Sequence, residues 1–100
     1  MNVHIDDKEL ENLYISGKSK KLKLKPNIID KYFATIQKLE AAKDIHDLWK
    51  DPSLNFEKYK KHYSIRLTGK YRLEMLVKWM NDEQTIGEFH LFSISNHYGD

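Results

Sequence analysis

Two runs of alternating apolar and polar residues limit what this chain can fold into. Tyr63, Ile65 and Leu67 alternate with polar residues, and every odd position of 71–79 is apolar. A period of two is typical of strands that bury one face. Thr68, Gly69 and Lys70 separate the two runs, and such a three-residue loop with glycine commonly closes a hairpin. The pattern therefore predicts an antiparallel β-hairpin.

The odd length of this loop predicts the register of the hairpin. Ile65 should lie opposite Leu73, and Arg66 opposite Arg72, the only two arginines of the chain. Like charges directly across a ladder are destabilising. Either an acid such as Glu74 compensates them, or this face holds an anion, because the guanidinium fork grips carboxylate or phosphate.

The residues before the hairpin predict one short strand and several helices. Val3 and Ile5 indicate an opening strand. Asp6 and Glu9 have the spacing of a capping box, so Asp6 is the expected N-cap of a short helix that Gly17 ends.

A longer helix is expected over 27–42, where apolar residues recur at spacings of three and four and Asn27 can cap the N-terminus. Asp44 should begin another short helix, which Pro52 ends. Trp49 is expected to pack between that helix and the sheet.

The remaining segments complete an α+β pattern. Residues 54–59 fit an edge strand and 81–84 a polar turn. The run 86–94 is apolar on both faces, with Phe89 on one and Ile94 on the other, so it should be central and covered on both sides. This order predicts N-terminal helices packed on a small twisted antiparallel sheet.

Length and composition fit one soluble domain over 1–100. The chain is 40% hydrophobic and 32% charged, and its net charge of +2 permits a nucleic-acid partner without requiring one. It has no cysteine, which excludes disulfides and thiolate metal sites. The longest apolar runs are a few residues, and the first ten residues are acidic where a signal peptide is basic and apolar. We expect a cytoplasmic protein with no membrane partner.

Five lysines crowd the segment 18–25, where Leu22 and Leu24 alternate with them. The apolar residues should pin this segment in part. A solvated connector and an arm that faces phosphates are both consistent with such a sequence.

The last residues form a polar cluster after a hydrophobic strand. Ser95, Asn96, His97 and Tyr98 include a side chain that titrates near neutrality and another that can donate a proton or stack on a base. An ordinary polar terminus is the alternative. The other histidines, at positions 4, 46, 62 and 90, are scattered, and each alone is typical of a surface residue.

Together these features indicate RNA cleavage without a metal or other cofactor. That reaction needs a base for the 2′-hydroxyl, a cation for the charged phosphorane and an acid for the leaving 5′-oxygen. Arginines, a lysine-rich rim and a His–Tyr pair at the end of a sheet could supply them.

The segments GKSKKLKLKP, PSLNFEK, YSIRLTGKYRLEM and ISNHYG closely resemble HigB-type (killer protein) toxins of the RelE/ParE superfamily. The resemblance runs from about Leu10 to Gly99. It implies a RelE-like fold and a ribosome-dependent mRNA endonuclease (an mRNA interferase), which cuts messenger RNA in the ribosomal A site. It also implies a cognate antitoxin with a helix-turn-helix domain, similar to HigA.

The resemblance also implies the site residues. Arg72, His97 and Tyr98 match the catalytic positions, and RNA-binding roles are expected for a second set: Lys58, Lys60, Lys61, Arg66 and Asn96. Many relatives end in Asp-Tyr-His where this chain has Asn-His-Tyr, and many carry a histidine before the hairpin where this chain reads SLNFEKYKK. The general base is therefore left open, with His62 nearby on the Arg66 face.

Two other functions stay open at this point. The ParE branch shares the fold but poisons DNA gyrase. A catalytically inactive RNA-binding member would show salt-sensitive binding without cleavage.

Overall fold

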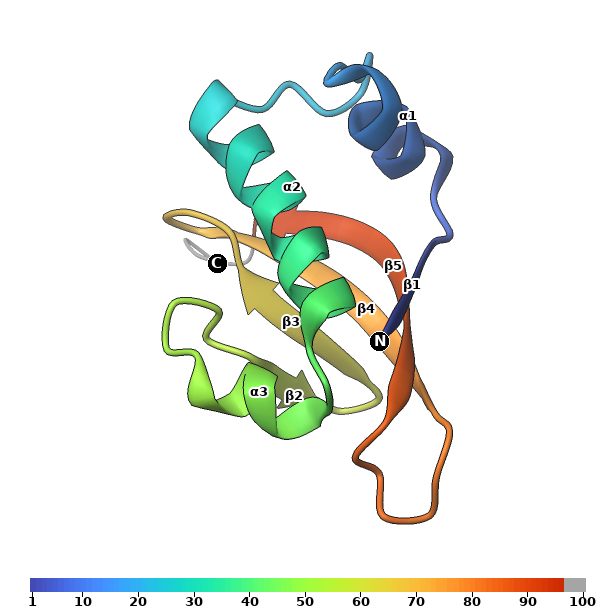
Figure 1. Cartoon of the computed structure of the whole chain (residues 1–100). Helices are drawn as coiled ribbons and strands as arrows, with labels where there is room; N and C mark the ends of the chain where they lie inside the picture. The colour runs from blue at the N-terminus through green and yellow to red at the C-terminus, as the bar shows by residue number, and fades with distance from the viewer. Residues whose placement is uncertain (97–100) are drawn as a thin grey trace.

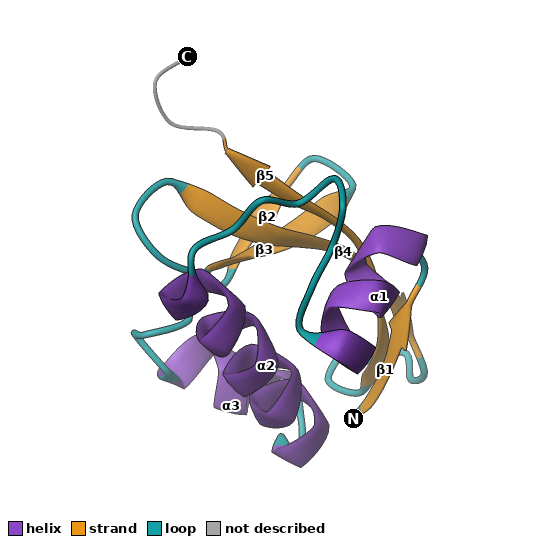
Figure 2. Ribbon diagram, turned by 90° about the horizontal axis from the view of Figure 1, so that it is seen from above, coloured by secondary structure: helices purple, strands orange, loops and turns teal. Residues whose placement is uncertain are grey.

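A five-stranded sheet carries three helices on one of its faces (Figure 1). The computed structural model describes residues 1–96. Its elements, in chain order, are β1 (Asn2–Ile5), α1 (Lys8–Ser16), α2 (Pro26–Ala41), α3 (Ile45–Lys50), β2 (Glu57–Tyr59), β3 (His62–Arg66), β4 (Tyr71–Trp79) and β5 (Gly87–Asn96). Seen from above, the helices lie to one side of the strands (Figure 2). The α+β fold expected from the sequence is confirmed.

The sheet is mixed, which corrects the expectation of a purely antiparallel one. Its strand order is β1-β5-β4-β3-β2, and β1 pairs with β5 in parallel while the other three pairs are antiparallel. The alternation of apolar and polar residues in β1 predicts a strand, but it does not predict which other strand pairs with it. Tertiary packing places the first strand beside the last.

The hairpin of β3 and β4 has the predicted register. Ile65 pairs with Leu73, and Arg66 pairs with Arg72. The loop is closed by the Leu67 amide, which donates to the Tyr71 carbonyl at 3.0 Å. The odd loop length therefore sets which side chains share a face.

The core lies between the helices and the inner face of the sheet. Leu73, Met75, Phe89 and Leu91 are fully buried there. From α2, Tyr32 reaches across to α1, and its hydroxyl donates to the Leu10 carbonyl at 2.9 Å. Desolvation raises the pKa of Tyr32 above its ordinary value, which keeps this donor protonated.

A β-bulge in β5 changes which face its side chains occupy. Glu74 pairs with Ser93 but Met75 pairs with Leu91, so Phe92 is an extra residue. Past the bulge, Ile94 pairs with Leu73 and therefore lies on the core face. The expectation of Ile94 on the opposite face was wrong because a simple period of two cannot include a bulge. β5 is interior in the sheet, but within residues 1–96 no helix covers its outer face.

Two helix starts differ from the sequence prediction. The N-cap of α1 is Asp7, whose carboxylate accepts from the Leu10 amide at 3.0 Å. Asp6 instead extends the β1 pairing, since its amide donates to the Leu91 carbonyl. In α2 the N-cap is Lys25 with Pro26 at the first turn, not Asn27. Proline favours this position because its φ angle is already helical.

The ends of α1 and α3 agree with the prediction in part. Gly17 ends α1 with a φ of 73°, and Asp44 caps α3 by accepting from the His46 amide. Trp49 is half exposed and packs on Phe56 with ring centroids 4.6 Å apart, so it does not lie between α3 and the sheet. A six-residue helix is too short to bury both of its faces.

β2 is shorter than the strand expected over 54–59. Leu54 and Phe56 are buried in the core before the strand begins at Glu57. Among the described residues no helix has the length and apolar character needed to cross a membrane.

Candidate nucleic-acid interface

The outer face of the sheet carries a polar cluster where β3, β4 and β5 run side by side near one end of the sheet. Parity and register place the side chains of Ser64, Arg66, Arg72, Glu74 and Ser95 on this face. Ser64, Arg72 and Glu74 are buried, although no helix within the described part of the chain covers them. Buried polar groups of this kind need hydrogen-bond or ion-pair partners.

Arg72 is held by groups from three segments. Its Nε donates to the Ser64 hydroxyl at 2.9 Å, and its Nη2 donates to the Asn55 carbonyl at 3.0 Å. The Nη2 atom also lies 3.5 Å from a carboxylate oxygen of Glu57, a side chain that is about half exposed. The guanidinium is thus oriented by short neutral contacts and has a longer, solvent-exposed anionic partner.

His62 lies on the same face and pairs with Glu74. Its Nε2 is 3.1 Å from the Glu74 Oε2, and the side chain of Glu74 is only 9% exposed. The ring of Phe92, the bulge residue, meets the His62 ring edge-on at 5.8 Å. A buried carboxylate that orients an imidazole is the arrangement expected for a proton-transfer pair.

Arg66 and Ser95 flank Arg72 in the ladder. Arg66 pairs with Arg72 from β3 and is exposed, whereas Ser95 pairs with it from β5. The Ser95 hydroxyl is buried and has no hydrogen-bond partner among the described residues. Three neighbouring strands therefore bring together two guanidinium groups and one hydroxyl that has no hydrogen-bond partner among the described residues.

Three predicted RNA-binding lysines gather at the β2–β3 turn. Lys58, Lys60 and Lys61 are exposed. Lys58 pairs with Tyr63, so it lies on the helix side of the strand, with its Nζ 5.8 Å from the Tyr63 ring centroid. Lys60 occupies the turn with a φ of 56°. These lysines border the cluster at the sheet edge rather than lying above Arg72.

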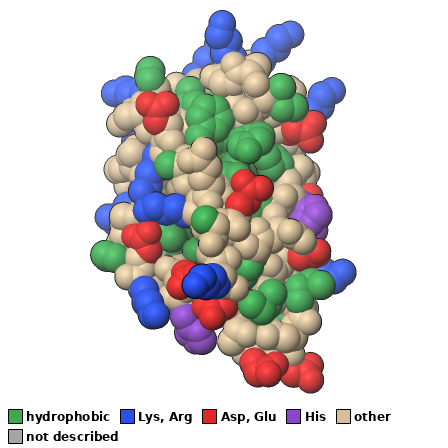
Figure 3. Space-filling model, in the orientation of Figure 1, with side chains coloured by type: hydrophobic (Ala, Val, Ile, Leu, Met, Phe, Trp, Pro, Cys, Tyr) green, Lys and Arg blue, Asp and Glu red, His purple; other side chains and the backbone are tan. Residues whose placement is uncertain are grey.

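The lysine-rich segment before α2 adds a second basic surface. Leu22 and Leu24 are half-buried against the core, which confirms that the segment is pinned, while its lysines are exposed. Figure 3 shows Lys and Arg side chains at the end of the molecule where α1 and α2 are connected. A hollow of about 450 Å³ lies between this segment and the β3–β4 loop, lined by Lys23, Lys25, Asn27, Ile28, Thr68, Gly69, Lys70 and Tyr71.

The C-terminal part of the predicted site is described only up to Asn96. Asn96 is exposed and pairs with Tyr71, so it lies on the helix side while Ser95 lies on the Arg72 side. The predicted catalytic residues His97 and Tyr98 lie outside the described residues.

The sequence analysis missed the residues that orient Arg72. Ser64 could have been found, because the hairpin register places it on the Arg66 and Arg72 face. Glu57 and the Asn55 carbonyl belong to a segment whose path depends on the buried Leu54 and Phe56, and no local pattern indicates that path. Glu74, which the sequence offered as the compensating acid, pairs with His62.

A comparison with protein families identifies the family of the chain. A family model for the HigB-like toxin, described as the RelE-like toxin of the type II toxin–antitoxin system HigB, matches residues 3–90. Comparison with curated proteins gave no match. The matched residues include both basic surfaces and the members of the sheet cluster up to Glu74, whereas Ser95 lies beyond the match.

Proposed function

Because this chain belongs to the RelE-like HigB toxins of type II toxin–antitoxin systems, we propose that it cleaves messenger RNA on the ribosome and so stops translation. The observation that carries the proposal is the buried Arg72 near the start of the central strand β4, with an exposed Arg66 opposite and the His62–Glu74 pair beside it. A type II toxin has an antitoxin partner, and we propose one with a helix-turn-helix domain, similar to HigA.

The arginine cluster supports a phosphate-binding role. A phosphate oxygen could replace the Glu57 carboxylate at Arg72 Nη2, since that contact is long and the Glu57 side chain is about half exposed. Arg66 would hold a neighbouring part of the RNA backbone, and the buried Ser95 hydroxyl would gain its missing hydrogen-bond partner. Preorganised cations of this kind stabilise the charge that develops on the phosphorane.

Proton transfer is assigned to two histidines, His62 and His97. In our proposal His62 accepts the proton of the 2′-hydroxyl, and Glu74 orients its ring. The 2′-oxygen attacks phosphorus, and the 5′-oxygen leaves with a proton from His97. The products are a 2′,3′-cyclic phosphate and a 5′-hydroxyl. Tyr98 would stack on a base, while Asn96 and the turn lysines at 58, 60 and 61 would contact the RNA or raise its local concentration.

The proposal is tested by primer extension on a reporter mRNA in a cell-free translation extract. The expected result is discrete cuts within the translated region that disappear when initiation is blocked. Cuts that persist without translation would remove the ribosome from the proposal. Loss of DNA supercoiling by gyrase with intact mRNA would favour the gyrase-inhibiting alternative.

Glu57→Gln is expected to strengthen RNA binding, because the carboxylate competes with phosphate for Arg72. The gain should be about fivefold, which corresponds to about 1 kcal/mol for a long ion pair whose carboxylate is about half exposed. The measurement is fluorescence anisotropy with a 2′-O-methyl oligonucleotide, which cannot be cleaved by 2′-oxygen attack.

Glu83→Gln is the matched control for that experiment. It makes the same charge change at an exposed position in the β4–β5 turn. An equal gain in both variants would mean that only net charge matters, and that Glu57 does not compete at Arg72.

A further inference from the structure

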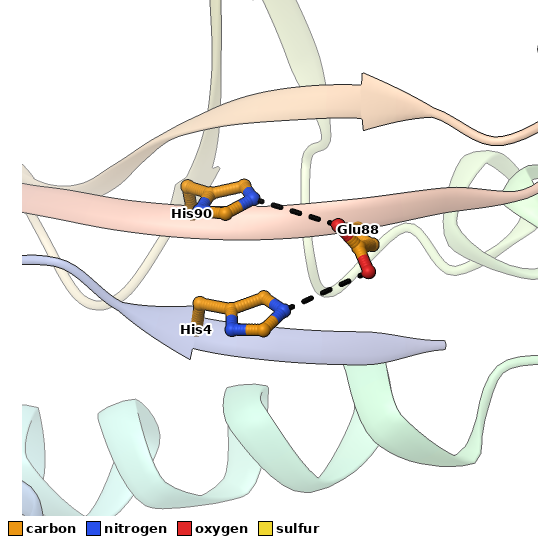
Figure 4. A group of neighbouring side chains, drawn as sticks. All are labelled: His4, Glu88 and His90. Atoms are coloured by element: carbon orange, nitrogen blue, oxygen red, sulfur yellow. Dashed lines mark ion pairs between the residues drawn. The ribbon is translucent and has the colours of Figure 1, made fainter.

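Two histidines from opposite ends of the chain meet on the outer face of the sheet. His4 of β1 and His90 of β5 are a register pair, and their rings stack with centroids 4.7 Å apart. Both rings are directed toward the Glu88 carboxylate of β5 (Figure 4). Parallel pairing of the first and last strands is what brings these three side chains together.

The distances within this cluster are too long for hydrogen bonds and somewhat longer than those between the ligands of one metal ion. His4 Nε2 lies 3.8 Å from one Glu88 oxygen, and His90 Nε2 lies 3.9 Å from the other. A hydrogen bond needs about 3.2 Å or less. Ligands bound tetrahedrally at about 2.0–2.1 Å are roughly 3.3 Å apart. All three ligand atoms lie within 4.8 Å of one another, so small rotations of partly exposed side chains would close the site.

Asp6 supplies the outer contact that metal-bound histidines usually have. Its Oδ2 lies 3.0 Å from His90 Nδ1. In a neutral imidazole this contact assigns the proton to Nδ1 and leaves the Nε2 lone pair facing Glu88. A cation placed between this lone pair and the Glu88 carboxylate would be attracted to both.

We propose that His4, Glu88 and His90 bind a divalent transition metal of the Zn²⁺ class. Two imidazole nitrogens and one carboxylate are a common zinc donor set, with solvent free to take the fourth position at the exposed His4. The bound ion joins the edge strand β1 to β5, and it does so independently of the proposed RNA cleavage. Leu76 of β4 pairs with His90 and Arg72 lies four residues earlier, so the ion would lie roughly 13 Å or more from the arginine cluster.

The test is calorimetric titration of the metal-free full chain with Zn²⁺. Wild type should bind one ion. Asp6→Asn, which removes an outer contact of His90, should weaken Zn²⁺ binding by about 10–100-fold. His4→Ala and His90→Ala, which each remove a ligand, should weaken it by more. His46→Ala is the matched control, because His46 is an exposed histidine outside the cluster, and it should bind as wild type does. Cluster variants that bind Zn²⁺ as tightly as wild type, or a wild type that binds none, would overturn the proposal.

A second readout separates this site from adventitious surface binding. Zn²⁺ should slow hydrogen exchange of the β1 amides and raise the melting temperature of wild type and His46→Ala, but not of His4→Ala, because only a bound ion that bridges the strands stabilises the edge. All of these proteins should show the same melting temperature in chelator, since His4 is exposed. Stabilisation of every variant alike by Zn²⁺ would also contradict the bridge.

Discussion

Replacing Arg72 by alanine is expected to reduce mRNA cleavage by roughly 10²–10³-fold, the loss typical when one preorganised group that stabilises transition-state charge is removed. The guanidinium is buried on the outer face and is oriented by Ser64 and the Asn55 carbonyl. Primer extension in a translating extract measures the effect. A folded Arg72→Ala protein that cuts at the wild-type rate would place the reaction elsewhere on the molecule.

Two further variants separate charge from geometry at this position. Arg72→Lys keeps the positive charge but loses the two-pronged fork, so it should recover only a small part of the activity. Arg66→Ala removes the exposed guanidinium directly across the ladder and should cost less, because solvent and mobile ions screen an exposed charge. Equal losses in the Arg66 and Arg72 variants would mean that the face acts only through its total charge.

The Arg72 variant also needs a stability measurement. The buried Ser64 hydroxyl loses its partner, which costs about 1–3 kcal/mol in the free energy of unfolding. Thermal unfolding of each variant shows the temperature range in which it stays folded. Activities should be compared within that range, because lost activity is informative only for a folded protein.

Leu73→Ala is expected to have the largest effect on stability, lowering the free energy of unfolding by about 2–5 kcal/mol. The Leu73 side chain is fully buried on the core face of β4, between Ile65 and Ile94 in the ladder. For a chain of this size the melting temperature should fall by roughly 10–30 °C. Thermal denaturation followed by far-UV circular dichroism measures it.

Leu76→Ala is the matched control, with the same change of residue three positions along the same strand. Leu76 points to the outer face and is 50% exposed, so its loss should cost less than about 1 kcal/mol. Similar costs for the two variants would mean that the outer face is covered to the same extent as the core face, against the one-sided sheet described above.

Short-range patterns predicted most of the secondary structure. The β3–β4 register, the glycine that ends α1 and the Asp44 cap depend on neighbouring residues, and all three were confirmed. The N-caps of α1 and α2 were misplaced because Asp6 is used in strand pairing and Pro26 begins α2. At α1, strand pairing uses the residue that the local pattern offers as a cap. At α2, the proline starts the helix earlier than the expected cap.

The candidate site could be predicted only in part. The arginine pair followed from loop length, but the partners that bury Arg72 come from 55–57 and β3, and they meet through the packing of Leu54 and Phe56. The bulge at Phe92 moved Ile94 to the core and left Phe92 beside His62. The sequence contains no residue pattern that indicates this bulge, because Phe92 continues the run of mixed apolar and polar residues without a break.

By itself the sequence determined the helices, the strands and the pairing of Arg66 with Arg72, because these depend on side-chain periods and on the length of one loop. Only the tertiary structure decided that β1 lies parallel to β5, that Arg72 is buried and partnered, and that His4 meets His90 and Glu88. These contacts join residues far apart in the chain. Their geometry is set by how the helices and the sheet bury their apolar faces together, which no single segment encodes.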